Sequence, residues 1–171
     1  DLVYQLIKLN RLSLCKHLNM KKIEHIGIAV KSLDNSNALF AKLFGKEHYK
    51  IEAVEREGVK TSFFILGETK IELLESTNEE SAISKFIEKR GEGVHHIAYA
   101  VDDIYAEMHR LEAAGFQLLN KEPLPGADNK LICFLHPKST NGVLVELCMD
   151  RPWKDEATNQ MIMIYCFVLI E

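Results

Sequence analysis

The sequence predicts an α+β fold made of two copies of a βαβββ module whose strands form a cleft-shaped sheet. The first observation is a strand pattern around a histidine that occurs twice, with His25 and His96 standing 71 residues apart (96 − 25). The second is the strand that ends each copy, which carries a glutamate between apolar residues, Glu72 and Glu146. Two copies are too few for a solenoid, so we expect a duplicated unit with a site between its halves.

The first strand of each copy has one face of small residues around its histidine. His25 shares a face with Gly27, and His96 shares a face with Ala98, while large apolar residues alternate to the other face. Such a face leaves open space around an imidazole that can bind a metal or another ligand. His95 falls on the opposite face and is therefore not predicted to be a ligand.

Module one covers residues 22–76. After its first strand, Asp34 or Ser36 can cap a helix that ends at Gly45. The positions of this helix that we expect to face the sheet are Ala38, Leu39, Leu43 and Phe44. Strands are predicted at residues 49–54, 59–66 and 69–75, with a turn at residues 67–68.

A connector helix is predicted within residues 77–92, capped by Thr77 or Asn78. Module two then covers residues 93–149 and repeats the order, with a helix from residue 104 that ends at Gly115. Its later strands are expected at residues 116–119, 130–135 and 142–148, and a loop at residues 123–129. The segment at residues 136–141 either grips a ligand or simply connects a hairpin.

The predicted domain covers residues 20–150. Residues 1–19 have no place in the repeat, so we expect an upstream extension or, alternatively, a basic targeting peptide. Residues 151–171 are expected to be a tail. Within this tail, the apolar run at residues 161–170 is too short to span a membrane as a helix.

Charge and cysteine content narrow the function classes. The net charge of −4 argues against nucleic-acid binding, which needs a basic surface to neutralise phosphates. The four cysteines have no Cys-x-x-Cys spacing, which favours free thiols in a reducing compartment. We therefore expect a cytoplasmic protein that binds neither nucleic acid nor membrane, or a mitochondrial matrix protein if residues 1–19 are a transit peptide.

Four groups occupy equivalent places in the two modules, and we predict that they hold one metal ion. These are His25 and His96 on the first strands and Glu72 and Glu146 on the last. A single strand histidine is more often structural than a ligand. An unpaired buried carboxylate is costly, however, and all four groups recur together. Two imidazoles and two carboxylates suit Co²⁺, Ni²⁺, Mn²⁺ or Zn²⁺.

These motifs resemble those of the vicinal-oxygen-chelate (glyoxalase) superfamily, and most closely its methylmalonyl-CoA epimerase family. The resemblance covers about residues 21–149. It is carried by residues 25–30 (HIGIAV), 70–75 (KIELLE), 93–104 (GVHHIAYAVDDI), 134–139 (FLHPKS) and 142–147 (GVLVEL). The single histidine motif is shared across the superfamily, whereas the combination of the last three motifs is much more specific.

The resemblance implies a glyoxalase-like cleft sheet, a homodimer and interconversion of (R)- and (S)-methylmalonyl-CoA. It implies a divalent metal, Co²⁺ first among the candidates, held by His25, His96 and Glu146, with Glu72 where the family has glutamate or glutamine. Glu146 is then the expected base at C2 of the CoA thioester. The family's second base is a glutamate at the position we align with Thr61, which is not a base at neutral pH. Further expected contacts to the CoA phosphates or the substrate carboxylate come from Lys130, Lys138 and Ser139.

Two other functions are compatible with this sequence. A lactoylglutathione lyase-type enzyme would share the metal and the proton shift but act on a glutathione hemithioacetal. A metal-free module of the same fold would bind a small molecule without catalysis. The four ligand positions count against that module, and the motif at residues 136–139 (HPKS) favours the epimerase over the lyase.

Overall fold

A computed structural model describes residues 20–151 of the chain. The first module contains β1 (Ile23–Val30), α2 (Leu33–Phe44), β2 (Lys50–Val54), η2 (Glu55–Glu57), β3 (Val59–Leu66) and β4 (Thr69–Ser76). α3 (Ala82–Arg90) connects it to the second module, which contains β5 (Gly93–Ala100), α4 (Ile104–Ala113), β6 (Leu124–Pro125), β7 (Lys130–Leu135), η3 (Pro137–Ser139) and β8 (Val145–Asp150). The α+β fold class predicted from the sequence is confirmed.

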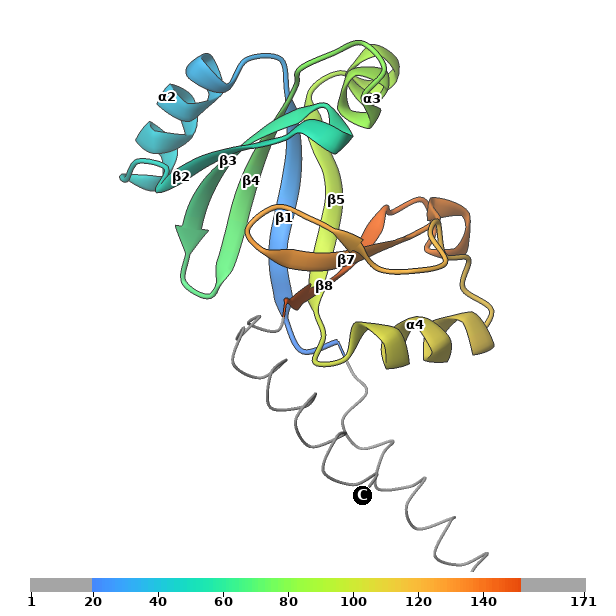
Figure 1. Ribbon diagram of the computed structural model, residues 1–171. Helices are drawn as coiled ribbons and strands as arrows, with labels where there is room; N and C mark the ends of the chain where they lie inside the picture. The colour runs from blue at the N-terminus through green and yellow to red at the C-terminus, as the bar shows by residue number, and fades with distance from the viewer. Residues whose placement is uncertain (1–19, 152–171) are drawn as a thin grey trace, which may run out of the picture.

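All the strands of the described residues belong to one curved sheet, in the order β2-β3-β4-β1-β5-β8-β7-β6 (Figure 1). The two modules meet where β1 pairs antiparallel with β5 at the centre of this sheet. On the outer side of this pair, β1 pairs parallel with β4, and β5 pairs parallel with β8. The four central strands therefore repeat one arrangement on either side of the module boundary.

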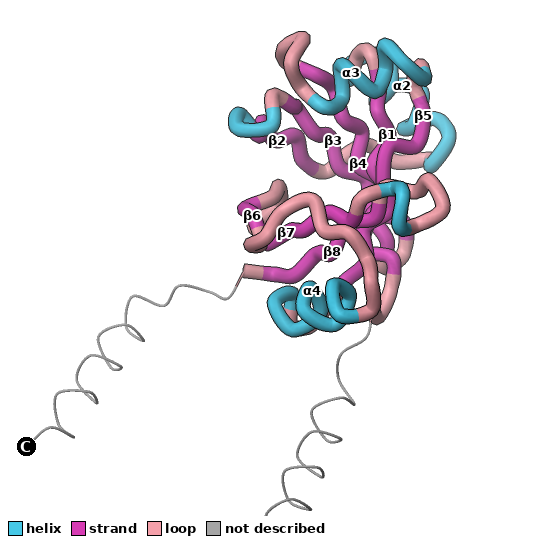
Figure 2. Tube along the Cα trace, turned by 90° about the vertical axis from the view of Figure 1, so that its right-hand side faces the viewer, coloured by secondary structure: helices cyan, strands magenta, loops and turns pink. Residues whose placement is uncertain are grey.

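Each module covers one face of its strands with a helix. In module two, Met108 and Leu111 of α4 pack against Leu135 and Leu147 of the sheet. In module one, α2 packs against Phe64 and Leu73. α3 packs on the small-residue face instead, where Ile83 contacts Ala29 and Leu74. Figure 2 shows α3 and α4 at opposite ends of the molecule, with the strands between them.

The predicted sheet-facing side of α2 is wrong. Leu39 and Leu43 are 63% and 70% exposed; of the predicted positions Phe44 packs against the sheet, and it does so together with Phe40. The helix begins at Leu33 because Ser32, rather than Asp34 or Ser36, is the N-cap and accepts a hydrogen bond from the Asn35 N–H. On the packed side, the buried Asn37 accepts a hydrogen bond from the Ser62 hydroxyl (2.7 Å), so an apolar pattern could not reveal this face.

Three other element boundaries differ from the prediction. α3 begins after Ser81, not after Thr77 or Asn78. The residues before Ser81 form a polar turn instead, in which the Ser76 hydroxyl donates a hydrogen bond to the Asn78 carbonyl and lies 2.7 Å from the Ser81 hydroxyl. Residues 116–119 contribute only a single bridge, from Leu118 to Leu135. Residues 124–125, predicted as loop, pair with β7 as the short strand β6, and the last strand is Val145–Asp150 rather than residues 142–148.

Two cysteines lie inside the described part of the chain. Cys133 and Cys148 are buried free thiols, as the spacing of the cysteines predicts. No helix between residues 20 and 151 has the length and apolar character needed to cross a membrane. The predictions for residues 1–19 and 152–171, with Cys15 and Cys166, fall outside the described residues.

Candidate metal centre

The four predicted ligands come from the four central strands of the sheet. Glu72 lies on β4, His25 on β1, His96 on β5 and Glu146 on β8, so the two carboxylates flank the two imidazoles. The register places them in two neighbouring rows, since Gly27 is opposite both Glu72 and His96, and Ala98 is opposite both His25 and Glu146. All four side chains are buried.

Three of these side chains bring their donor atoms together. The Nε2 atoms of His25 and His96 are 2.9 Å apart, and Glu146 Oε2 lies 3.3 Å from His96 Nε2 and 3.7 Å from His25 Nε2. Donors that share one ion at bonds of about 2.1 Å lie roughly 3.0–3.4 Å apart in octahedral or tetrahedral geometry. The three distances lie on either side of this range and within 0.3 Å of it, so His25, His96 and Glu146 could bind a metal. Glu72 is adjacent, with Oε1 3.4 Å from His25 Nδ1, but is not part of this compact group.

Gly27 makes the room that the His96 imidazole occupies. A Cβ atom added to Gly27 would lie 2.3 Å from His96 Cε1 and 2.7 Å from both ring nitrogens. No side chain larger than hydrogen fits there without displacing the ring, because real Cβ contacts essentially never fall below 3.0 Å. The small-residue face predicted from the sequence is therefore required by the position of the imidazole.

A bulge adds Glu24 to this side of the sheet. Ile23 and His25 of β1 pair with the adjacent residues Tyr99 and Ala98 of β5, so Glu24 is the extra residue of a β-bulge. Glu24 therefore does not follow the alternation of the strand and is buried beside His25. Its Oε2 accepts a hydrogen bond from His25 Nδ1 (2.6 Å), which leaves His25 Nε2 facing His96. Sequence reasoning missed Glu24 because strict alternation places it on the opposite face from His25.

A second bulge does the same for His95, so the face predicted for His95 is wrong, although His95 is not part of the candidate ligand group. The register shift between Gly27 and Ile28 turns His95 toward the cavity, where it is one of the lining residues. Its Nδ1 lies 2.9 Å from His96 Nδ1, and its ring packs edge-on against Phe86. Burial lowers the pKa of His95 to about 4, so its imidazole is neutral at pH 7. Glu24 and His95 occupy equivalent positions of the two modules.

The site perturbs the protonation of its own groups. Burial lowers the pKa of His25, but the neighbouring Glu72 and Glu146 carboxylates outweigh burial and hold it well above the usual value. Burial and the positive His25 lower the pKa of His96 well below its usual value. Burial also raises the pKa of Glu72 to about 7, despite the attraction of His25. Without a metal, one imidazole therefore carries the proton and the other is neutral.

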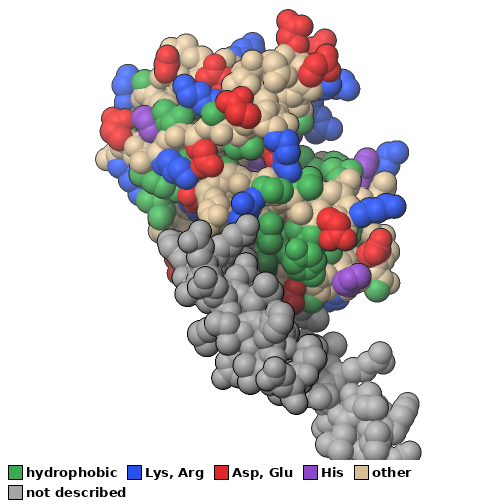
Figure 3. All heavy atoms as spheres, viewed as in Figure 1, with side chains coloured by type: hydrophobic (Ala, Val, Ile, Leu, Met, Phe, Trp, Pro, Cys, Tyr) green, Lys and Arg blue, Asp and Glu red, His purple; other side chains and the backbone are tan. Residues whose placement is uncertain are grey.

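The site opens into a cavity of about 430 Å³. Its walls are mostly apolar and include Leu74, Ile132 and Phe134, and Thr61 is buried in the same wall. Lys130 lies in the wall as well, but its Nζ is held by Asp150 (2.6 Å) and Glu24 (3.2 Å). Figure 3 shows apolar, Lys and Arg side chains around the hollow between the upper and lower parts of the molecule.

The other two predicted substrate contacts lie elsewhere. Lys138 is exposed on η3 and does not line this cavity. The Ser139 hydroxyl donates to the His136 carbonyl (2.9 Å) and accepts from the Gln117 N–H (3.2 Å), so it fixes its own loop. The motif at residues 136–139 therefore builds a 3₁₀ turn, with His136 Nδ1 accepting from the Lys138 N–H.

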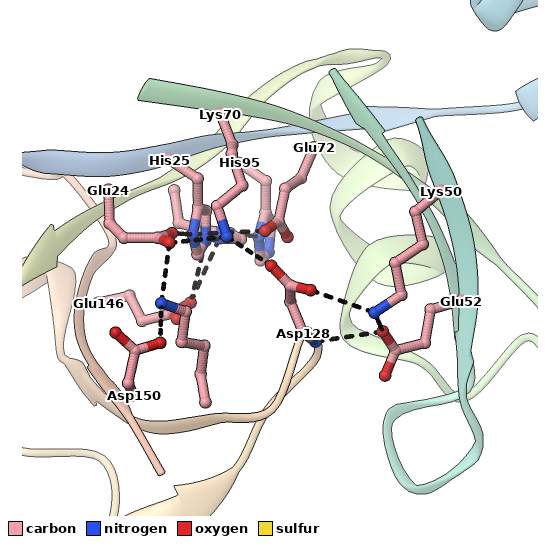
Figure 4. A network of polar contacts seen from close by, with 12 residues as sticks. Glu24, His25, Lys50, Glu52, Lys70, Glu72, His95, Asp128, Glu146 and Asp150 are labelled. Atoms are coloured by element: carbon pink, nitrogen blue, oxygen red, sulfur yellow. Dashed lines mark hydrogen bonds and ion pairs between the residues drawn. The ribbon is translucent and has the colours of Figure 1, made fainter. Parts of the chain in front are cut away.

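A network of charges crosses the cleft between the modules (Figure 4). Asp128, from the β6–β7 turn of module two, pairs with Lys70 (2.6 Å) and Lys50 (3.1 Å) of module one. Lys70 continues to Glu24 Oε1 at 2.7 Å, and Glu24 contacts His25. The network thus joins the turn at the cleft mouth to the imidazole at its centre.

Comparison with known proteins agrees with this geometry. Residues 24–134 match the model of the Glyoxalase/Bleomycin resistance protein/Dioxygenase superfamily. The chain is 38% identical over 132 residues to the uncharacterized protein YqjC of Bacillus subtilis, covering 77% of this chain and 94% of that protein. It is 42% identical over 128 residues to an ethylmalonyl-CoA/methylmalonyl-CoA epimerase of Cereibacter sphaeroides, covering 74% of this chain and 96% of that protein.

A solved structure extends the comparison to three dimensions. A variant of Streptomyces coelicolor methylmalonyl-CoA epimerase in complex with 2-nitronate-propionyl-CoA superimposes with a TM-score of 0.75 at 36% identity, covering 77% of this chain and 96% of that one. The chain therefore belongs to the glyoxalase/bleomycin resistance/dioxygenase superfamily and is related to its methylmalonyl-CoA epimerases.

Proposed function

We propose that this protein is a methylmalonyl-CoA epimerase that exchanges the proton at C2 of the thioester. The observation that carries the proposal is the arrangement of two buried carboxylates on opposite flanks of a buried imidazole pair, inside an apolar cavity. Epimerisation requires access from two sides, because a proton must leave one face of a planar enolate and return to the other. Two relatives are epimerases of methylmalonyl-CoA, which supports the same substrate class.

The chemistry needs both the metal and the carboxylates. A divalent ion at His25, His96 and Glu146, with Glu72 completing the ligand set, supplies Lewis-acid stabilisation of negative charge on the substrate oxygens. We propose Co²⁺ as the first metal to test. The mostly apolar walls of the cavity strengthen these electrostatic interactions, because apolar surroundings screen charges less than water does. In this proposal the Glu146 carboxylate takes the C2 proton from one face.

Thr61 stands where a second carboxylate is expected, so another group must serve the second face. Thr61 is buried, and its hydroxyl is not a base at neutral pH. Glu72 is the buried carboxylate on the strand paired with that of Thr61, on the flank opposite Glu146. We propose that Glu72 carries the second proton. Of the three predicted substrate contacts, Lys130 lines the cavity, where it pairs with Glu24 and Asp150. We therefore keep Lys130 as the proposed contact to the substrate.

The decisive experiment follows the C2 proton of methylmalonyl-CoA in D₂O by NMR, with Co²⁺ added. Wild-type protein should exchange the proton and racemise the substrate. Glu146→Gln should lose racemisation and should exchange only the enantiomer whose C2 proton faces Glu72. Glu72→Gln should still bind metal, because an amide oxygen can replace one carboxylate oxygen as a ligand, and should exchange the proton of one enantiomer without racemising it.

Each departure from this pattern has a defined meaning. If Glu72→Gln racemises normally, Glu72 is not the second base. If the metal-loaded wild type exchanges nothing, the epimerase proposal is wrong, and an assay with methylglyoxal and glutathione tests the lyase. Metal analysis that finds no stoichiometric ion and no binding of Co²⁺ favours a metal-free binding module. A homodimer remains a prediction, which light scattering can test.

A further inference from the structure

Each imidazole of the metal centre has a hydrogen-bonding neighbour that directly precedes it in the sequence. Glu24 precedes His25 and accepts from its Nδ1 at 2.6 Å, and His95 precedes His96, with the two Nδ1 atoms 2.9 Å apart. Glu24 and His95 are 71 residues apart (95 − 24), the same offset as His25 and His96. The repeat therefore extends from the candidate ligands to the residues that contact them.

The His95–His96 pair admits one arrangement of protons when His96 acts as a ligand. His96 directs Nε2 toward His25 and Glu146, and this nitrogen has to be free of a proton to bind a metal. The proton of the neutral His96 ring then lies on Nδ1, which faces His95 Nδ1. His95 must therefore accept at Nδ1 and carry its own proton on Nε2. A histidine ligand whose second nitrogen donates in this way is held in one tautomer.

Packing restricts both rings but does not select their orientation. Phe86 of α3 packs edge-on against His95, with ring centroids 5.0 Å apart, and Phe134 does the same to His96 at 5.6 Å. The missing side chain of Gly27 gives the His96 ring its room. A half-turn of an imidazole about its Cβ–Cγ bond is nearly isosteric, yet it would present Cε1 instead of Nε2 to a metal. The hydrogen bond to His95 distinguishes the two orientations.

We propose that His95 is a positioning residue for the metal ligand His96, whose Nδ1–H it accepts at Nδ1, so that His96 Nε2 is directed at the metal. The inference rests on the metal centre of the proposed function but not on its substrate. It assigns to His95 in module two the part that Glu24 plays in module one. An imidazole acceptor adds no negative charge to a site that already contains the buried carboxylates of Glu24, Glu72 and Glu146.

Co²⁺ binding to the full chain, measured by calorimetry, tests this role through a conservative rescue. His95→Asn keeps an acceptor oxygen near the position of Nδ1, whereas His95→Leu keeps bulk and removes the acceptor. We expect His95→Leu to bind Co²⁺ about 10–100-fold more weakly than the wild type, and His95→Asn to recover most of that loss. Equally weak binding by the two variants assigns the loss to packing of the ring and overturns the proposal.

His48→Leu is the matched control. His48 is also a partly buried histidine packed edge-on against a phenylalanine, Phe64, but it does not line the metal cavity. His48→Leu should therefore bind Co²⁺ like the wild type. A loss of affinity equal to that of His95→Leu would show that removing any such histidine weakens the site, which would overturn the specific role of His95.

The tautomers provide a readout that needs no variant and no catalysis. With Zn²⁺ as a diamagnetic probe, ¹⁵N NMR should place the His96 proton on Nδ1 and the His95 proton on Nε2. A His95 proton on Nδ1 overturns the proposal, because that nitrogen could not accept. Tight and equal Co²⁺ binding by wild type and His95→Leu also overturns it, while the metal centre of the proposed function stands. Absence of metal binding by the wild type overturns that metal centre and this inference together.

Discussion

Gly27→Ala is the substitution that most directly tests the geometry of the metal centre. The new methyl group would lie 2.3 Å from His96 Cε1, whereas ordinary contact begins at 3.4 Å, so the ring must move by about 1.1 Å (3.4 − 2.3). The backbone of Gly27 does not need the left-handed region, so the effect is purely steric. Overpacking of this kind costs about 1–3 kcal/mol in stability.

The effect on metal binding should exceed the effect on stability. Ligand atoms must stay within about 0.2 Å of their bonding distance, so a ring displaced by about 1 Å is no longer a ligand. Loss of a mere outer contact already weakens metal binding about 10–100-fold, and loss of His96 should cost at least as much. Calorimetry with Co²⁺ measures the affinity, and urea unfolding of the metal-free protein measures the stability.

A matched pair of variants isolates the clash. His96→Ala removes the ring, so adding Gly27→Ala to it should cost almost no further stability. The comparison is between the stability that Gly27→Ala removes from the wild type and the stability that it removes from His96→Ala. If the two losses are equal, the cost does not come from the His96 ring. Wild-type metal affinity in Gly27→Ala would refute the assignment of His96 as a ligand in this geometry.

Three further outcomes follow from the polar contacts of the site. Glu24→Gln should weaken Co²⁺ binding about 10–100-fold in calorimetry, because Glu24 fixes the His25 ring; an unchanged affinity would remove Glu24 from the metal centre. Metal binding should weaken from pH 8 to pH 6 and release protons, since His25 has a raised pKa and must lose its proton to bind; calorimetry in buffers of different ionisation enthalpy counts the protons. Asp128→Asn should lower stability at pH 7 by about 1 kcal/mol. Burial raises the pKa of Asp128, but hydrogen bonds from Lys70 and Lys50 outweigh burial and hold the pKa below 3.8. The stability difference between wild type and Asp128→Asn should therefore persist above pH 3.8. It should disappear as the pH falls through the lowered pKa, which chemical denaturation at several pH values measures.

The repeat in the sequence contained most of the information about the fold. Because His25 and His96 stand at equivalent positions, the repeat predicted that they share one site, and the structure brings their Nε2 atoms to 2.9 Å. The glutamates were predicted from the same repeat, and the structure brings them to the site because the last strand of each module pairs parallel with the first. Local alternation and one internal repeat were therefore sufficient for the centre of the sheet.

The same alternation rule failed wherever the backbone departs from it. Each of the two bulges inserts one residue into the central strand pair, and these residues, Glu24 and His95, are the neighbours of the metal centre that the sequence did not reveal. A hydrophobic pattern in the sequence does not reveal a bulge. The face of α2 failed for a different reason, because Asn37 is buried with a hydrogen-bonded partner while Leu39 is exposed.

The position of the metal centre also has a consequence for how this chain folds. Its donors span 121 residues (146 − 25) and come from both modules, so the site exists only after the most distant strands have paired. Such non-local pairing is the slow part of folding, because the chain loses its freedom before the contacts form. A metal at 100 times its Kd adds about 2.7 kcal/mol to the native state alone. Bound metal should therefore slow unfolding more than it speeds folding, because it stabilises the native state and not the states before the strands have paired.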